Sequence, residues 1–145
     1  MIQIPEGYGY ILAAATSTAL LHTYHLVLTS SARKASGIKY PTPYATEEQA
    51  AKDPKAYKFN VAQRAHANYT ENLTPFLALL GVAGLAYPTQ TAYLGWGWVI
   101  SRFAYAFGYT TYGPPGRGIG FLGSELATLG LLYYAGLTSW NAIKA

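Results

Sequence analysis

The sequence predicts an all-α integral membrane protein, a four-helix bundle whose single domain covers residues 1–145. Hydrophobic residues make up 51% of the chain and charged residues only 11%, well below the roughly 25% charged residues of an average soluble domain. The chain also holds 14 tyrosines and 3 tryptophans, whose rings favour the boundary between a membrane and water. Finally, long stretches with almost no charge alternate with short turns. Together these observations indicate helices that cross a membrane.

The first predicted helix covers approximately residues 7–33. No charged residue lies between Glu6 and Arg33, a gap of 26 residues, and about 20 apolar residues are enough to cross the hydrocarbon core. A cleaved signal peptide is less favoured, because the apolar run exceeds the usual signal core of about 7–15 residues. Arg33 and Lys34 end this stretch, where cations complement the helix dipole and anchor the cytosolic edge of a span.

Three further helices are predicted at about residues 59–86, 89–112 and 119–143. Pro88 separates the first two of them, and the turn GPPGRG at 113–118 separates the last two. Neither proline nor a run of glycines continues a helix readily. Irregular backbone cannot cross lipid with its polar groups unpaired, so four helices joined by polar turns account for the chain.

The basic residues are concentrated in one part of the sequence. Seven of the ten lie between residues 33 and 64, and the net charge is +4. Their place between two apolar stretches favours a loop on one membrane face, so we expect no nucleic-acid partner. The third loop adds Arg117. The excess of positive charge therefore predicts that the first and third loops face the cytosol, with both termini on the other side.

Two predicted helices each carry a polar stripe at membrane depth. The first stripe is about 80° wide, and His66 points nearly the opposite way; its members are Asn60, Arg64, Asn68 and Glu71. The second is about 60° wide, and its members are Trp98, Arg102, Tyr105 and Tyr109. Polar groups at this depth are costly unless they face a bundle interior or a wet cavity. We therefore expect a cationic pocket that opens to the cytosol and binds a small anion.

Structural roles remain open for several of these residues. Arg64 and Glu71 could form an ion pair that ties helices together. Arg102 could pair with Glu71 or Glu125, and for Arg102 this structural role is favoured. His22 and His25 lie three residues apart without a third ligand, so we expect polar packing there and no metal site. The chain has no cysteine, so any thiol chemistry must use a thiol that arrives with the substrate.

The stretch FNVAQRAHANYTENLTPF at 59–76 resembles the FNxxQRAHxN…E…PF signature of the membrane-associated proteins in eicosanoid and glutathione metabolism, the MAPEG family. Further pieces follow in the order of the family: SARK at 31–34, KYPTPY at 39–44, SRFAYAFGYTTYGPP at 101–115 and RGIGFLGS at 117–124. The QRAHxN core is highly specific, whereas the shorter pieces are individually weak. Within the family, the chain is most similar to the microsomal glutathione S-transferases of type 3.

The resemblance implies a homotrimer in the membrane of the endoplasmic reticulum, with glutathione bound as co-substrate between neighbouring subunits. It implies that Arg117 lies beside the glutathione sulfur and is the catalytic residue. It also implies that Arg33 acts at the subunit boundary and that His66 reaches the site of the neighbouring subunit. The other residues that the resemblance assigns to glutathione binding are Arg64, Asn68, Glu71, Tyr105 and Tyr109.

From the resemblance we expect a glutathione transferase that acts on lipophilic electrophiles and reduces lipid hydroperoxides. Leukotriene C4 synthesis is less favoured, because Asn72 and Lys34 stand where leukotriene C4 synthase has a tyrosine and an arginine. The turn before Arg117 is one residue longer than in that enzyme, a difference that bears on the role assigned to Arg117. Two other functions remain open. A non-catalytic lipid-presenting protein of the lipoxygenase-activating type would have a degraded thiol site, and a small transporter or channel subunit would account for Arg102 within a span.

Overall fold

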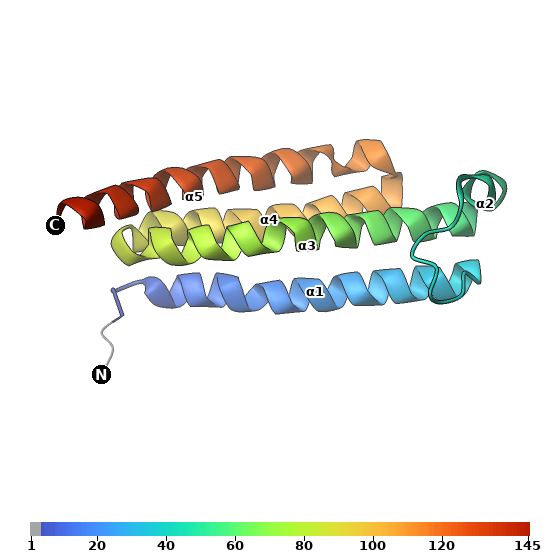
Figure 1. The fold of residues 1–145 in the computed structure, drawn as a ribbon, viewed down its shortest axis with the longest axis horizontal. Coiled ribbons are helices and arrows are strands. Elements are labelled where there is room, and N and C mark those ends of the chain that lie inside the picture. Colours follow the sequence, from blue (N-terminus) through green and yellow to red (C-terminus); the bar gives the residue numbers. More distant parts are fainter. Residues whose placement is uncertain (1–3) are drawn as a thin grey trace.

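The computed structural model describes residues 4–145, so residues 1–3 of the predicted domain lie outside it. Within this range the chain forms four long α-helices that lie side by side (Figure 1). A short helix and a 3-10 turn connect them. The elements are α1 (Tyr8–Ser36), α2 (Glu47–Lys52), α3 (Pro54–Ala86), α4 (Pro88–Tyr112), η1 (Pro114–Arg117) and α5 (Gly118–Lys144).

The long helices run up and down, and α3 and α4 lie between α1 and α5 (Figure 1). The loop that contains α2 lies at the same end of the bundle as η1, whereas the start of α1 and the end of α5 lie at the other end. α4 packs against α1, α3 and α5. The two helices that carry the predicted polar stripes are therefore the two central ones.

The observed helix boundaries differ from the predicted ones where a local signal was overlooked. α3 begins at Pro54, so the predicted start at residue 59 is wrong by five residues. The side chain of Asp53 accepts a hydrogen bond of 2.8 Å from the backbone N–H of Lys55, and proline is favoured at the first position of a helix. α1 ends at Ser36, three residues after its predicted end at Arg33. Gly37 follows with a φ of 69°, a left-handed conformation that suits glycine at the end of a helix.

Glycines bring η1 and α5 close to α4. A Cβ atom at Gly108 of α4 would overlap the backbone of Gly116 in η1, and a Cβ atom at Gly120 of α5 would overlap the backbone of Tyr105. The turn at 113–118 interrupts the helix as predicted, but α5 starts again directly after η1. These close contacts fix the position of Arg117, which follows Gly116, relative to the end of α4.

The core consists of aromatic and aliphatic side chains that point between the helices. Phe76 of α3 stacks on Trp98 of α4 with their ring centroids 3.8 Å apart. The hydroxyl of the buried Tyr69 donates a hydrogen bond of 2.6 Å to the backbone carbonyl of Thr18, so its polar atom is satisfied inside the bundle. Leu80 and other apolar residues complete this cluster.

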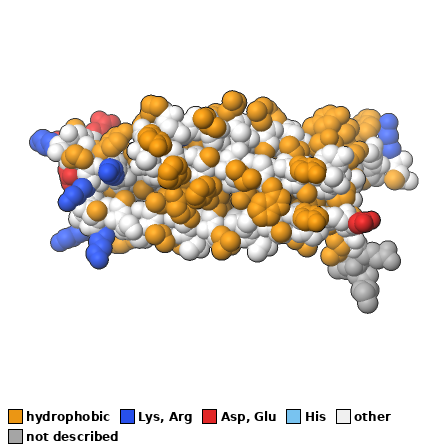
Figure 2. Space-filling model, turned by 180° about the vertical axis from the view of Figure 1, so that it is seen from behind, with side chains coloured by type: hydrophobic (Ala, Val, Ile, Leu, Met, Phe, Trp, Pro, Cys, Tyr) orange, Lys and Arg blue, Asp and Glu red, His pale blue; other side chains and the backbone are white. Residues whose placement is uncertain are grey.

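Large hydrophobic side chains are also exposed along the helices, and Figure 2 shows them over the whole length of one face. Most lysines and arginines visible there lie at one end. An apolar surface of this extent marks contact with a membrane or another protein. Among the described residues, α1 is the one helix long and apolar enough to cross a membrane, with a mean hydropathy of 1.4. This helix and the apolar surface fit association with a membrane; that α3, α4 and α5 also cross it stays a prediction.

Candidate functional site

A cleft of about 460 Å³ opens at the basic end of the bundle. Its walls come from α3, from the end of α4, and from α2 with the loop before it. Two predicted site residues, Arg64 and Tyr109, line it. Tyr44, Glu47 and Tyr57 also line it, and the sequence analysis missed all three. The cleft therefore joins the predicted polar stripe of α3 to that of α4.

The loop between α1 and α3 is held against α3 by side-chain hydrogen bonds. The carboxamide of Asn60 accepts a bond of 2.8 Å from the backbone N–H of Ala45 and donates one of 2.9 Å to its carbonyl. Gln63 donates a bond of 2.8 Å to the carbonyl of Pro43. Asn60 was predicted to belong to the polar stripe, and the structure shows that its polar atoms fix the wall of the cleft.

The short helix α2 completes this wall. Thr46 and Gln49 form a reciprocal capping box at its start, in which each side chain satisfies a backbone N–H of the other residue. Glu47 follows the cap and lines the cleft. The spacing of Thr46 and Gln49 is the signal that could have predicted this helix from the sequence.

Arg117 contacts Tyr109, one of the residues that line the cleft. Its guanidinium carbon is 5.1 Å from the centroid of the Tyr109 ring, within the distance of about 6 Å at which a cation is attracted to an aromatic face. The close contact between Gly108 and Gly116 holds the turn in this position. The structure therefore gathers Arg64, Tyr109 and Arg117 at one end of the bundle.

Arg64 pairs with Glu71 along α3. Nη1 of Arg64 is 3.5 Å from Oε1 of Glu71, and the two side chains are 52% and 55% exposed. An ion pair this exposed contributes only about 0–1 kcal/mol to stability, so both groups can exchange partners at low cost. Pro75 lies inside α3 and has no N–H to donate to the backbone carbonyl of Glu71 four residues earlier.

Asn68 faces the interior and is bound by Arg102. Nη1 of Arg102 donates a hydrogen bond of 2.7 Å to Oδ1 of Asn68, and Nη2 lies 3.7 Å from Oε1 of Glu125. The Arg102 side chain is only 1% exposed. Arg102 thus pairs with Glu125 rather than Glu71, and its contact with Asn68 fixes the orientation of the Asn68 carboxamide.

Tyr105 is buried beneath the cleft. Its ring meets the ring of Tyr109 edge to face, with centroids 5.7 Å apart. Both tyrosines pack against Val61 and Ala65 of α3. Of the two tyrosines predicted to contact glutathione, Tyr109 reaches the cleft directly, and Tyr105 supports it from below.

Arg33 and His66 are not brought to the cleft. Nη1 of Arg33 donates a hydrogen bond of 2.8 Å to the carbonyl of Thr42, and its guanidinium lies over the rings of Tyr40 and Phe59 at 4.2 and 4.4 Å. In a single chain, Arg33 therefore holds the loop after α1.

His66 faces α1, as its position opposite the polar stripe predicted. Its ring centroid is 5.3 Å from that of His22 and 5.6 Å from that of His25. His66 therefore packs with the two other histidines of the chain, away from Arg64.

A comparison with known protein families adds one finding to this geometry. The family model described as "MAPEG family" matches residues 11–137. The match begins in α1 and ends in α5, and it includes α3, α4 and η1 entirely. All the predicted site residues, from Arg33 to Arg117, fall within it.

Proposed function

Because the chain belongs to the MAPEG family, we propose that it is a membrane-bound glutathione transferase, similar to the microsomal enzymes of type 3. The family includes glutathione transferases, leukotriene C4 synthase and proteins of the lipoxygenase-activating type. The observation that carries our choice among them is that Arg64 and Tyr109 line one cleft and that the guanidinium of Arg117 contacts the ring of Tyr109. A protein that only presents lipid has no need for such a cationic group of residues.

The charges around the cleft suit glutathione, which carries two carboxylates, one ammonium and one thiol. Arginine holds carboxylates through paired hydrogen bonds, and we assign this role to Arg64. Its partner Glu71 is available to receive the ammonium, because their mutual ion pair is weak and exposed. Asn68 contributes its carboxamide, which Arg102 orients. The volume of about 460 Å³ lies within the usual range of about 300–1,000 Å³ for small-molecule pockets.

Arg117 is the group that we assign to the glutathione sulfur. The reactive form of a thiol is the thiolate. A fall of its pKa from about 8.5 to about 6.5 requires only about 2.7 kcal/mol of selective stabilisation of the anion. One guanidinium group in a partly dry site can supply this. Tyr109 supports that guanidinium on its ring face, so the charge stays at the edge of the cleft.

The chemistry then needs no nucleophile from the protein. The thiolate attacks an electrophilic carbon, a carbon–sulfur bond forms, and the leaving group departs with the electron pair. With a lipid hydroperoxide, the thiolate attacks the terminal oxygen, the O–O bond breaks, and the lipid alcohol is released. A second glutathione then converts the resulting sulfenic acid to glutathione disulfide and water. Since the chain has no cysteine, glutathione supplies both sulfur atoms.

The assembly and the membrane orientation belong to the same proposal. Arg33 and His66 lie outside the cleft of their own chain, and we assign them to the site of a neighbouring subunit in a homotrimer. The basic end of the bundle, with the cleft, faces the cytosol from the membrane of the endoplasmic reticulum. The four long helices then cross that membrane, and lipophilic substrates reach the thiolate from the bilayer.

The test uses the full chain purified in detergent. We expect it to bind glutathione in isothermal titration calorimetry, to conjugate glutathione to chlorodinitrobenzene, and to reduce a fatty-acid hydroperoxide. Lys52→Ala provides a control, because Lys52 pairs only with the exposed Glu48 among the described residues. A folded protein that binds no glutathione would contradict the proposal and favour the lipid-presenting function.

A further inference from the structure

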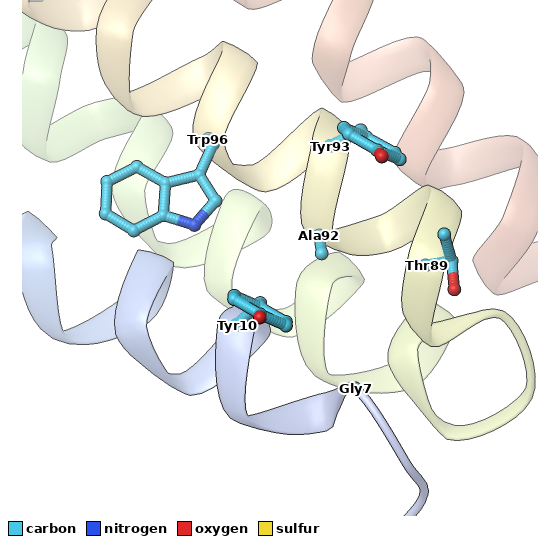
Figure 3. A pocket seen from close by; sticks show the side chains of 6 residues that line it. All are labelled: Gly7, Tyr10, Thr89, Ala92, Tyr93 and Trp96. Atoms are coloured by element: carbon cyan, nitrogen blue, oxygen red, sulfur yellow. The ribbon is translucent and has the colours of Figure 1, made fainter.

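A second pocket, of about 320 Å³, lies at the end of the bundle opposite the basic cleft. It is formed where the first turn of α1 meets the first turns of α4. Figure 3 shows rings from both helices around the small side chain of Ala92. The residues that line it are Gly7, Tyr10, Thr89, Ala92, Tyr93 and Trp96. None of them is charged, which sets this pocket apart from the cleft at the other end.

The pocket is built by a close approach of two helix starts. Gly7 has a φ of 81°, a left-handed conformation that suits glycine, and a Cβ atom there would lie 4.0 Å from Cβ of Pro88. Tyr10 therefore comes to lie near α4. Tyr93 and Trp96 are three residues apart on α4 and share one face of the helix. The three rings thus line one pocket where the starts of two helices meet.

These rings are exposed although they are large. Tyr10 is 69%, Tyr93 is 78% and Trp96 is 37% exposed. The faces of aromatic rings are negative, so a group of rings attracts a cation, and quaternary ammonium groups are recognised by cages of such rings. An anion finds no positive side chain among the lining residues. The lining therefore suits a weakly hydrated cationic group, such as a quaternary ammonium, better than an anionic one.

Exposed apolar side chains of α4 extend from the pocket along the helix. From Trp96, the exposed side chains of Ile100, Phe103 and Phe107 follow at spacings of four, three and four residues, so they continue one stripe along the helix. The stripe runs from the aromatic pocket towards the basic end. A molecule with a cationic head at the pocket could lay an acyl chain along it.

We propose that the aromatic pocket binds the trimethylammonium head of a phosphocholine lipid, whose chain lies along the exposed stripe of α4. The volume of about 320 Å³ is at the lower end for a small-molecule site, which fits a head group rather than a whole lipid. Tyrosine and tryptophan also favour the depth at which lipid head groups lie. The pocket shares no lining residue with the cleft, so the proposal is independent of the glutathione chemistry.

The experiment measures which lipids the purified protein retains. The full chain in a maltoside detergent is mixed with equal amounts of phosphatidylcholine, phosphatidylethanolamine and phosphatidylglycerol, and bound lipid is counted by native mass spectrometry. We expect selective retention of phosphatidylcholine. Tyr93→Leu should lower its affinity about fivefold, because one cation–aromatic contact is lost, whereas Tyr93→Phe should keep it within about twofold.

The control is Tyr133→Leu, which removes another exposed tyrosine from α5 outside the pocket, 61% exposed against 78% for Tyr93. It should leave lipid retention unchanged. Circular dichroism checks that each variant is folded. Equal retention of the three lipids, or no effect of Tyr93→Leu, would overturn the proposal. So would displacement of the lipid by an equal concentration of soluble phosphocholine, which has no chain for the stripe. A Tyr93→Leu variant that changes the oligomer mass but not the lipid preference would show a contact between copies instead.

Discussion

Arg64 and Arg102 belong to the two polar stripes that the sequence predicts, but they lie in opposite environments. Arg102 is 1% exposed and contacts Asn68 and Glu125. Arg64 is 52% exposed and has only the long contact to Glu71. Both residues are arginines on a helical stripe, so neither residue type nor periodicity separates them. The difference shows that burial, rather than charge, separates an arginine that holds the bundle together from one that is available to a ligand.

The two arginines also differ in how much stability is lost when each is replaced. Removing one member of a buried ion pair leaves the charge of its partner buried and unpaired, which costs about 3–5 kcal/mol of stability. Removing one member of an exposed pair costs about 0–1 kcal/mol. The comparison therefore makes predictions that can be ordered by their effect on the stability of the fold.

Replacing Arg102 should have the largest effect on stability. Arg102→Met keeps much of the apolar stem but removes the hydrogen-bond donor to Asn68 and the positive charge that pairs with Glu125. Because Glu125 remains partly exposed, we expect the lower end of the range, a loss of about 3 kcal/mol in the free energy of unfolding. Denaturation in detergent, followed by circular dichroism, measures this. An equal loss in Arg64→Met would contradict the distinction between the two arginines.

Replacing Gly108 should have an intermediate effect. The added methyl of Gly108→Ala would overlap the backbone of Gly116, and such overpacking costs about 1–3 kcal/mol. The displaced turn should also move Arg117 and reduce glutathione conjugation. Gly97→Ala is the matched control on the same helix, since no atom lies within 4 Å of its new Cβ. If both variants keep full activity and stability, the close contact does not position Arg117.

Replacing Arg64 should affect stability least and ligand binding most. Arg64→Ala should change the free energy of unfolding by less than about 1 kcal/mol, because its ion pair is exposed. Glutathione affinity should fall at least about tenfold, as expected when a charged hydrogen bond worth about 1.5–3 kcal/mol is lost. Calorimetry on the folded variant provides the measurement. Unchanged affinity would remove Arg64 from the proposed site.

Helical periodicity predicted the parts of this molecule that depend on residues close in sequence. It placed Arg64 away from His66, and the structure has Arg64 at the cleft and His66 against α1. The same periodicity grouped Asn60 with Arg64. Asn60 does line the cleft with Arg64. Its hydrogen bonds to the backbone of Ala45 could not be predicted, because the path of the loop depends on contacts that no helical pattern contains.

The partner of Arg102 could not be chosen from the sequence for a related reason. Both Glu71 and Glu125 were possible partners of Arg102. Which of them pairs with it depends on how closely α5 approaches α4. Gly120 permits that approach, since any side chain there would overlap the backbone of Tyr105. By contrast, the start of α3 at Pro54 and the capping box of Thr46 were local signals that a closer inspection would have found.

The central claim is that Arg117 stabilises the glutathione thiolate, and ultraviolet absorbance of the thiolate tests it most directly. Glutathione is titrated into the purified wild-type protein and into Arg117→Ala at neutral pH, after calorimetry has established that both bind it. We expect a thiolate signal that saturates with the wild type and is absent in the variant. The rate of glutathione conjugation should fall in the variant for the same reason, because less of the bound thiol is ionised. A variant that binds glutathione and shows the full thiolate signal would contradict the account.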